Sequence, residues 1–158
     1  MTENLKSEQN DQAPQFSILR LYLKDVSLET PNSPAIFTQD WKPDVNIQLA
    51  TNVSSVSDSI HEVVLSLTIT AKQGEKTGFL VEVQQAGLFS LKGHSEEQEN
   101  STLHAYCPAV LFPYAREAVS DLVTKGGFPP LLLAPVNFDA LYARKLKQTT
   151  VAASENSA

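Results

Sequence analysis

The sequence predicts an α+β fold, in which a four-stranded antiparallel sheet has helices packed on one face. Four segments with the alternation of a β-strand lie between residues 16 and 91, and helical patterns follow only after them. A short glycine-containing turn joins the last two strands, so these two are expected to be antiparallel. Strands followed by helices are typical of a sheet whose helices all lie on one side.

The first predicted strand, residues 16–29, has apolar residues on both faces. Strict alternation places three leucines on one face together with Asp25 and Glu29, and it places Phe16 and Val26 on the opposite face. Apolar residues on both faces indicate burial on both sides. Because helices cover only one side of a small sheet, we expect a second subunit to cover the other side. A strand buried twice within one chain is the alternative.

A proline-rich segment, residues 31–43, follows the first strand and contains Phe37 and the only tryptophan, Trp41. Its three prolines exclude a central strand, so it is predicted to be a loop that crosses the sheet. On the sequence alone, a tryptophan in such a loop is more often an anchor in the core than a ligand contact.

The remaining strands are predicted from alternation. Residues 45–49 form the second strand and 51–59 a turn region, while 61–73 and 77–91 form a hairpin closed at 73–76.

Helices are predicted in the last part of the chain. An acidic segment, 94–101, is interpreted as a loop before a helical stretch at 103–125, which ends at the glycines 126–127. Two prolines, Pro108 and Pro113, should kink or restart that helix, since proline lacks the N–H that the helix needs.

The chain then continues as an extended segment, residues 128–135, whose prolines forbid a helix and whose leucines 131–133 need an apolar partner. Asn137 is the predicted N-cap of the last helix. The domain prediction is a disordered arm at 1–14, one folded domain at 15–148 and a mobile tail at 149–158.

Composition narrows the class of protein. The chain has 158 residues, a net charge of −6 and a pI of about 5.0. An acidic surface disfavours nucleic acid or anionic membranes and suits a basic partner. A single cysteine excludes an intrachain disulfide, and the N-terminus carries no apolar signal core. We therefore expect a cytoplasmic protein without stable membrane insertion.

Catalytic and metal-binding patterns are weak. His104 and Cys107 are three residues apart, as a base and a nucleophile on one helix face would be, but no orienting acid accompanies them. A structural pair is the better interpretation. The other histidines, His61 and His94, lack metal-ligand spacing, and no glycine-rich loop could cradle a phosphate. We expect no enzyme activity, no cofactor and no metal.

Three functions remain open from the residues themselves. The chain could be a holdase for unfolded polypeptides, a carrier of a small apolar ligand in a sheet–helix cleft, or a structural subunit of an oligomer. Leucine-rich and aromatic irregular segments with an acidic exterior fit all three.

Several separated motifs resemble one family in the same order. They identify the chain as similar to SecB, the bacterial chaperone family for protein export, over roughly residues 16–146. The matching segments are LYLKDVSLETPNSPAIF (21–37), DWKP (40–43), FLVEVQQAGLFSL (79–91), YCPAVLFPYAREAVSDLV (106–123) and GGFPPLLLAPVNFDALY (126–142).

The resemblance implies a homotetramer, built as a dimer of dimers, that works without nucleotide hydrolysis. Such a protein keeps precursors of exported proteins unfolded and passes them to the translocation ATPase SecA. The implied SecA element is a small, basic, zinc-bearing C-terminal segment, so the zinc belongs to the partner.

The resemblance also implies roles for individual positions. Asp25, Glu29, Leu80 and Glu82 match the family's SecA-contacting positions, and the two pairs can meet only if they share one side of the sheet.

Three further residues match positions tied to tetramer assembly, where we expect one face of the fourth strand to join the dimers; Val81 replaces the family's usual cysteine. They are Val81, Val83 and Gln85.

For the client groove we expect aromatic residues of the crossover loop and of the segments beside the helices. They are Phe37, Trp41, Phe112 and Phe128.

Overall fold

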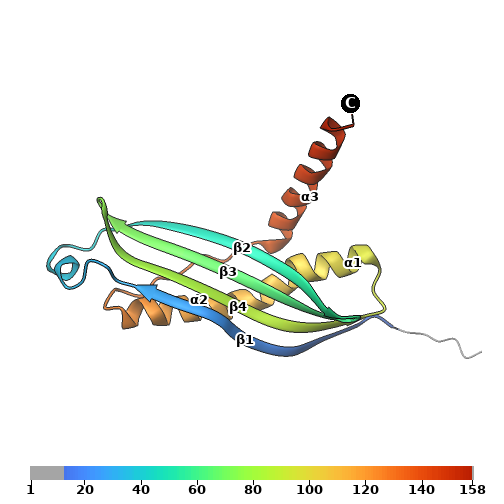
Figure 1. The fold of residues 1–158 in the computed structure, drawn as a ribbon, viewed down its shortest axis with the longest axis horizontal. Coiled ribbons are helices and arrows are strands. Elements are labelled where there is room, and N and C mark those ends of the chain that lie inside the picture. The colour runs from blue at the N-terminus through green and yellow to red at the C-terminus, as the bar shows by residue number, and fades with distance from the viewer. Residues whose placement is uncertain (1–12, 158) are drawn as a thin grey trace, which may run out of the picture.

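The computed structural model describes residues 13–157, so most of the predicted N-terminal arm, 1–14, lies outside the described residues. Its strands are β1 (Gln15–Glu29), β2 (Asp44–Ser57), β3 (Ile60–Gln73) and β4 (Lys76–Lys92). They form one antiparallel sheet in the order β1-β4-β3-β2, with β1 and β2 at its edges (Figure 1). The predicted fold class is confirmed.

A short 3-10 helix, Ala35–Thr38, lies in the segment between β1 and β2, and the other helices follow the sheet in the chain. They are α1 (Glu96–Ser101), a π-helical turn (Thr102–Tyr106), α2 (Cys107–Lys125) and α3 (Phe138–Glu155). Figure 1 shows α2 along one face of the sheet, while α3 projects away from the body and ends near the C-terminus. Among residues 13–157, no helix has both the length and the apolar character that a membrane span requires.

The core lies between α2 and the face of the sheet that it covers. Alternate residues of β3 point toward α2, as predicted from the alternation Val63, Leu65, Leu67 and Ile69. On α2, the buried residues recur at helical spacing, so that one stripe faces the sheet. The helix contributes Cys107, Leu111, Ala115, Val119 and Val123 to this core.

The alternation expected in β1 was wrong, because two β-bulges interrupt it. Leu19 and Lys24 are extra residues without an opposite residue on β4. Each bulge shifts the alternation by one residue, so that the opposite residues of β4 place six apolar side chains of β1 on the face toward α2. These are Phe16, Ile18, Leu21, Leu23, Val26 and Leu28.

The correction to β1 removes the argument for burial on both sides. The face of β1 away from α2 carries polar side chains such as Arg20, Asp25 and Glu29. On the helix side, however, α2 does not reach the edge strand fully. Ile18 and Leu23 remain 45% and 51% exposed. An apolar surface without a partner within the subunit therefore lies on the helix side of the sheet.

The second strand is longer than expected. Residues 51–57, interpreted as part of a turn region, continue β2, and only residues 58–59 form the turn. Thr51 and Val53 lie opposite Leu65 and Val63 and so extend the same apolar face. The serines around them suit a strand because β2 is an edge, where polar side chains remain in water.

The acidic segment before the helices was also expected to be a loop, and it forms α1 instead. The Ser95 hydroxyl accepts a hydrogen bond from the Gln98 N–H, and the Gln98 side chain accepts one from the Ser95 N–H, each at 3.2 Å. This capping box satisfies two free donors of the first turn. The glutamates of that turn add a favourable interaction with the helix dipole.

The two prolines act differently. Pro108 lies in the first turn of α2, directly after the π-helical turn, where the helix passes from i→i−5 to i→i−4 hydrogen bonds. Pro113 lies inside α2, and the helix continues through it without the predicted restart. The predicted end of the helix is confirmed at Gly126, and Gly127 follows with a φ of 91°.

The C-terminal segments confirm one expectation and correct another. Asn137 caps α3, since its side chain accepts a hydrogen bond from the Ala140 N–H at 3.0 Å. Helix α3 runs to Glu155 and so includes most of the segment 149–158, whose mobility stays a prediction. Of the leucines expected to be packed, Leu133 is buried, but Leu132 is 85% exposed.

The buried position of Val83 generates a prediction. If Val83 joined the dimers, as the sequence analysis expects, a charged residue there would leave a folded dimer. We now expect Val83→Asp to destabilise the subunit by more than about 3 kcal/mol, because an unpaired charge would enter the core. Urea unfolding followed by circular dichroism measures this. The same exchange at the exposed Val56 is the control and should leave the midpoint nearly unchanged. An unaltered midpoint in Val83→Asp would contradict this core assignment.

Candidate functional site

The acidic face comprises Asp25, Glu29, Leu80 and Glu82, from the adjacent strands β1 and β4. Glu29 lies directly opposite Leu80, and Glu82 lies opposite the residue between the two β1 carboxylates. Opposite residues of an antiparallel pair point to the same side of the sheet. All four therefore lie on the face away from α2, which is the condition that the sequence analysis set for their meeting.

The chemistry of the acidic face suits a basic partner. The three carboxylates are exposed to solvent, and the leucine among them is partly exposed. Exposed charges attract and orient a partner of opposite charge, whereas a leucine adds apolar contact once the partner is bound. A basic peptide segment with one apolar side chain would match this arrangement.

A cluster of polar side chains borders the acidic face. Glu62 of β3 accepts hydrogen bonds from the Tyr22 hydroxyl and from the Lys24 Nζ, the latter at 2.7 Å. The bonds from Lys24 and Tyr22 lower the pKa of the Glu62 carboxyl below its usual value. Burial, followed by the bond to Glu62 and its charge, raises the pKa of Tyr22 to about 12. Glu62 therefore remains charged and Tyr22 protonated at neutral pH.

The second candidate site is an aromatic groove at the same end of β4 as the acidic face, but on the helix side of the sheet. The Phe128 ring lies at its centre, with ring centroids 4.8 Å from Trp41, 5.2 Å from Phe37 and 5.1 Å from Phe79. Phe128 is buried, while Phe37 is half exposed. The groove has a volume of about 350 Å³ and is lined by Ile36, Phe37, Gln39, Trp41, Gly127, Phe128 and Pro129.

Two glycines make the close packing of these rings possible. A Cβ atom on Gly78 would overlap the Trp41 ring, and a Cβ on Gly127 would meet the Phe37 ring at 3.0 Å. Gly127 also has a φ of 91°, which other residues rarely adopt. The backbone can therefore lie close to the Trp41 ring at Gly78 and to the Phe37 ring at Gly127, because neither glycine has a side chain.

The structure brings together three of the four predicted groove residues. Phe37, Trp41 and Phe128 share the aromatic groove, but Phe112 belongs to the core beneath α3. Its ring centroid lies 5.8 Å from that of Phe138 and 5.7 Å from the guanidinium carbon of Arg116. The prediction that Phe112 lines the same groove was therefore wrong, since a buried ring on α2 faces the sheet and α3 instead.

Sequence reasoning missed Phe79 and Gly78. Phe79 packs against Trp41, with ring centroids 6.1 Å apart. A glycine inside a strand is the signal that could have indicated close approach of another group.

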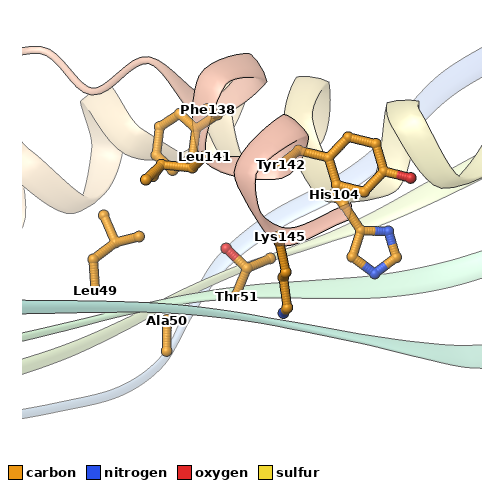
Figure 2. A pocket seen from close by; sticks show the side chains of 8 residues that line it. All are labelled: Leu49, Ala50, Thr51, His104, Phe138, Leu141, Tyr142 and Lys145. Carbon is orange, nitrogen blue, oxygen red and sulfur yellow. The ribbon is translucent and has the colours of Figure 1, made fainter. Parts of the chain in front are cut away.

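Another pocket lies between β2 and α3, with a volume of about 330 Å³. Figure 2 shows Leu49, Phe138 and Leu141 at its apolar end, and Lys145, His104 and Tyr142 at its polar end. The His104 and Tyr142 rings stack with centroids 5.7 Å apart and an angle of 14° between their planes. No sequence pattern indicated this pocket, because its walls come from segments far apart in the chain.

The three residues predicted for tetramer assembly lie inside the subunit. Val81 and Val83 face α2 within the core, and Gln85 is 4% exposed. The expectation that these side chains directly contact another pair of subunits was therefore wrong, because they have almost no exposed surface. An effect on assembly stays a prediction and would act through the elements that they support.

His104 and Cys107, the pair considered as a base and a nucleophile, do not form a catalytic site. Cys107 is fully buried, and burial raises the pKa of its thiol to about 12, so the reactive thiolate is absent at neutral pH. His104 instead contacts the backbone carbonyl of Asn100 through Nδ1 at 2.9 Å and stacks on Tyr142.

Comparison with known proteins gives a consistent result over nearly the whole chain. The family model described as "Preprotein translocase subunit SecB" matches residues 9–149. "Protein-export protein SecB" of Nitrosococcus oceani is 60% identical over 149 residues, covering 93% of this chain and 90% of that protein. The protein of the same name from Marinobacter nauticus is 53% identical over 150 residues, covering 94% and 91%.

Among solved structures, a SecB-like chaperone of Mycobacterium tuberculosis in complex with a ChAD peptide from an antitoxin has a similar fold. The TM-score is 0.59 at 22% identity, covering 77% of this chain and 90% of that chain.

The packing of Gly78 against Trp41 predicts the effect of one added methyl group. Gly78→Ala should displace the indole ring and weaken binding of an unfolded polypeptide to the aromatic groove by about threefold or more, with the sheet intact. Tryptophan fluorescence reports the ring, since Trp41 is the only tryptophan. Gly74→Ala, in an open hairpin turn with nothing within 4 Å, is the control for added volume. Unchanged fluorescence in Gly78→Ala would disprove the contact.

Proposed function

Because this chain belongs to the SecB family, we propose that it is an ATP-independent holdase chaperone that binds unfolded precursors of exported proteins and delivers them to the SecA ATPase. The observation that carries the proposal is the match of 53–60% identity over nearly the full length to proteins named for protein export. The family is one of chaperones, and the proposed function uses no cofactor. Its place of action is the cytoplasm, where precursors are met before export.

We propose the aromatic groove as a client-binding site. Its half-exposed Phe37 and partly exposed Trp41 offer an apolar surface that an unfolded segment can cover. Burying one large apolar side chain contributes about 1.5–3 kcal/mol, and association opposes this with several kcal/mol. Two or three client side chains thus give weak, reversible binding per groove. A long client that engages several grooves gains affinity by multivalency.

We propose the acidic face as the SecA contact. Its three carboxylates around Leu80 are complementary to a basic segment with an apolar side chain, which is the character of the zinc-bearing C-terminal segment that the family resemblance implies. The zinc belongs to that segment, so the chain itself needs no metal for the contact.

A homotetramer, arranged as a dimer of dimers, is the proposed assembly. Support comes from the helix side of both edge strands, where apolar residues remain exposed. On β1 these are Ile18, Leu23 and Val26, and on β2 they are Val45 and Ile47. A single subunit that leaves such a surface in water gains by covering it with another subunit.

A carrier of a small apolar ligand is the alternative function, and the pocket between β2 and α3 is the observation that favours it. Its volume of about 330 Å³ lies at the lower end for small-molecule sites. Native mass spectrometry after purification separates the two functions. The holdase forms complexes with an added unfolded polypeptide, whereas the carrier retains a small molecule and ignores the polypeptide.

The acidic face predicts the effect of charge reversal. Changing both Asp25→Lys and Glu29→Lys should abolish binding of the SecA C-terminal peptide in calorimetry, because repulsion is added to the loss of attraction. Exposed ion pairs contribute only about 0–1 kcal/mol each, so wild-type binding should weaken as salt is added.

The control is an equal charge reversal in the hairpin turns, Asp58→Lys with Glu75→Lys, at two exposed carboxylates outside the acidic face. This variant should bind the peptide nearly as wild type does, and both variants should still bind unfolded clients. Full binding of the peptide by the Asp25/Glu29 variant would refute the proposed contact.

A further inference from the structure

The position of the acidic face depends on one extra residue in β1. Leu23 lies opposite Gln85 and Asp25 lies opposite Gln84, so Lys24 has no opposite residue. Continuing the register of Leu23 without this bulge would place Asp25 opposite Val83 and Glu29 opposite Phe79. Both of those β4 side chains are buried in the core. The bulge therefore turns the two carboxylates from the core to the solvent.

A bulge in an edge strand needs something to hold it in place. β1 pairs only with β4, and the extra residue could occupy neighbouring positions if the ladder alone decided the register. Two side-chain contacts, one on each face of the sheet, lie at the Lys24 bulge.

On the helix side the contact comes from Gln85. Among residues 13–157, Gln85 is the one polar or charged residue that is buried, with 4% of its surface exposed. Its Nε2 donates a hydrogen bond to the backbone carbonyl of Tyr22 at 3.1 Å, just before the bulge. A buried amide without a partner would be unfavourable, so the carbonyl must stay where Gln85 can reach it.

On the opposite face the contact comes from Glu62. Its carboxylate accepts from Tyr22, just before the bulge, and from Lys24, the bulged residue itself. Both side chains reach across β4 to β3, and Ala86, opposite Tyr22 on β4, presents only a methyl group in their path. The Lys24 contact is an ion pair of 2.7 Å.

We propose that Gln85 and Glu62 are positioning residues for the SecA contact. Together they clamp the Lys24 bulge and so hold Asp25 and Glu29 on the acidic face. The inference rests on the proposed SecA function and adds residues that do not touch the partner. It also assigns to Gln85 a role within the subunit that its burial permits.

The test uses two variants of the full-length protein. Gln85→Met keeps the length of the side chain and removes the donor, and Glu62→Thr keeps a strand-compatible residue that cannot reach Lys24. Each should weaken binding of the SecA C-terminal peptide about three- to tenfold, the equilibrium worth of one hydrogen bond. Binding of an unfolded client should stay unchanged. Gln48→Met, the same exchange on the exposed surface of β2, is the control.

Nuclear magnetic resonance gives a readout that general destabilisation would not move. In wild type, cross-strand contacts join Asp25 to Gln84, and in the variants they should weaken while those between β3 and β4 remain. Peptide binding equal to wild type in both variants, or intact Asp25–Gln84 contacts in both, would overturn the proposal.

The two levels of inference can fail separately. If Gln85→Met does not fold, Glu62→Thr decides, since its side chain lies on the outer face. If wild type does not bind the peptide, the SecA contact is refuted, and the cross-strand contacts still decide whether the clamp holds the bulge.

Discussion

Burial of one face of the sheet beneath α2 is the constraint on which the rest of the structure depends. Val63, Leu65, Leu67 and Ile69 of β3 all point toward the helix and have almost no exposed surface. A strand side chain buried on this face must be apolar or, like Gln85, hydrogen-bonded, and one that points away can be polar. The sheet therefore has one face that makes the core and one that remains free for charged groups.

This constraint explains both proposed sites. The carboxylates of the acidic face can exist only on the free side, and the bulge at Lys24 brings Asp25 there. The aromatic groove lies on the helix side, where Phe128 follows α2 and packs over Phe79. The two proposed sites thus lie on opposite sides of the same sheet, so neither surface would have to be rebuilt for the other to bind.

The sequence predicted the features that depend on local patterns. Alternation in β3, the hairpin turn after it and the Asn137 cap need only neighbouring residues, and all were confirmed. Strict alternation failed in β1 because a bulge adds one residue and no particular residue type marks its position. The apolar residues of β1 were therefore assigned to the wrong faces.

Long-range packing was the other limit of the sequence. The position of Phe112 follows from its packing against Phe138 at the start of α3, and that of Trp41 from its approach to Gly78. Neither approach leaves a local pattern in the chain. Likewise, the family resemblance indicated which positions of β4 matter, but only the register showed that Gln85 lies in the core while Glu82 is exposed.

Simultaneous binding is the most direct test of a two-sided chaperone. Native mass spectrometry of the protein with an unfolded client and the SecA C-terminal peptide together should show a ternary complex, and the affinity for each should be independent of the other. Mutual exclusion of client and peptide would contradict the account, because it would require both to occupy one surface.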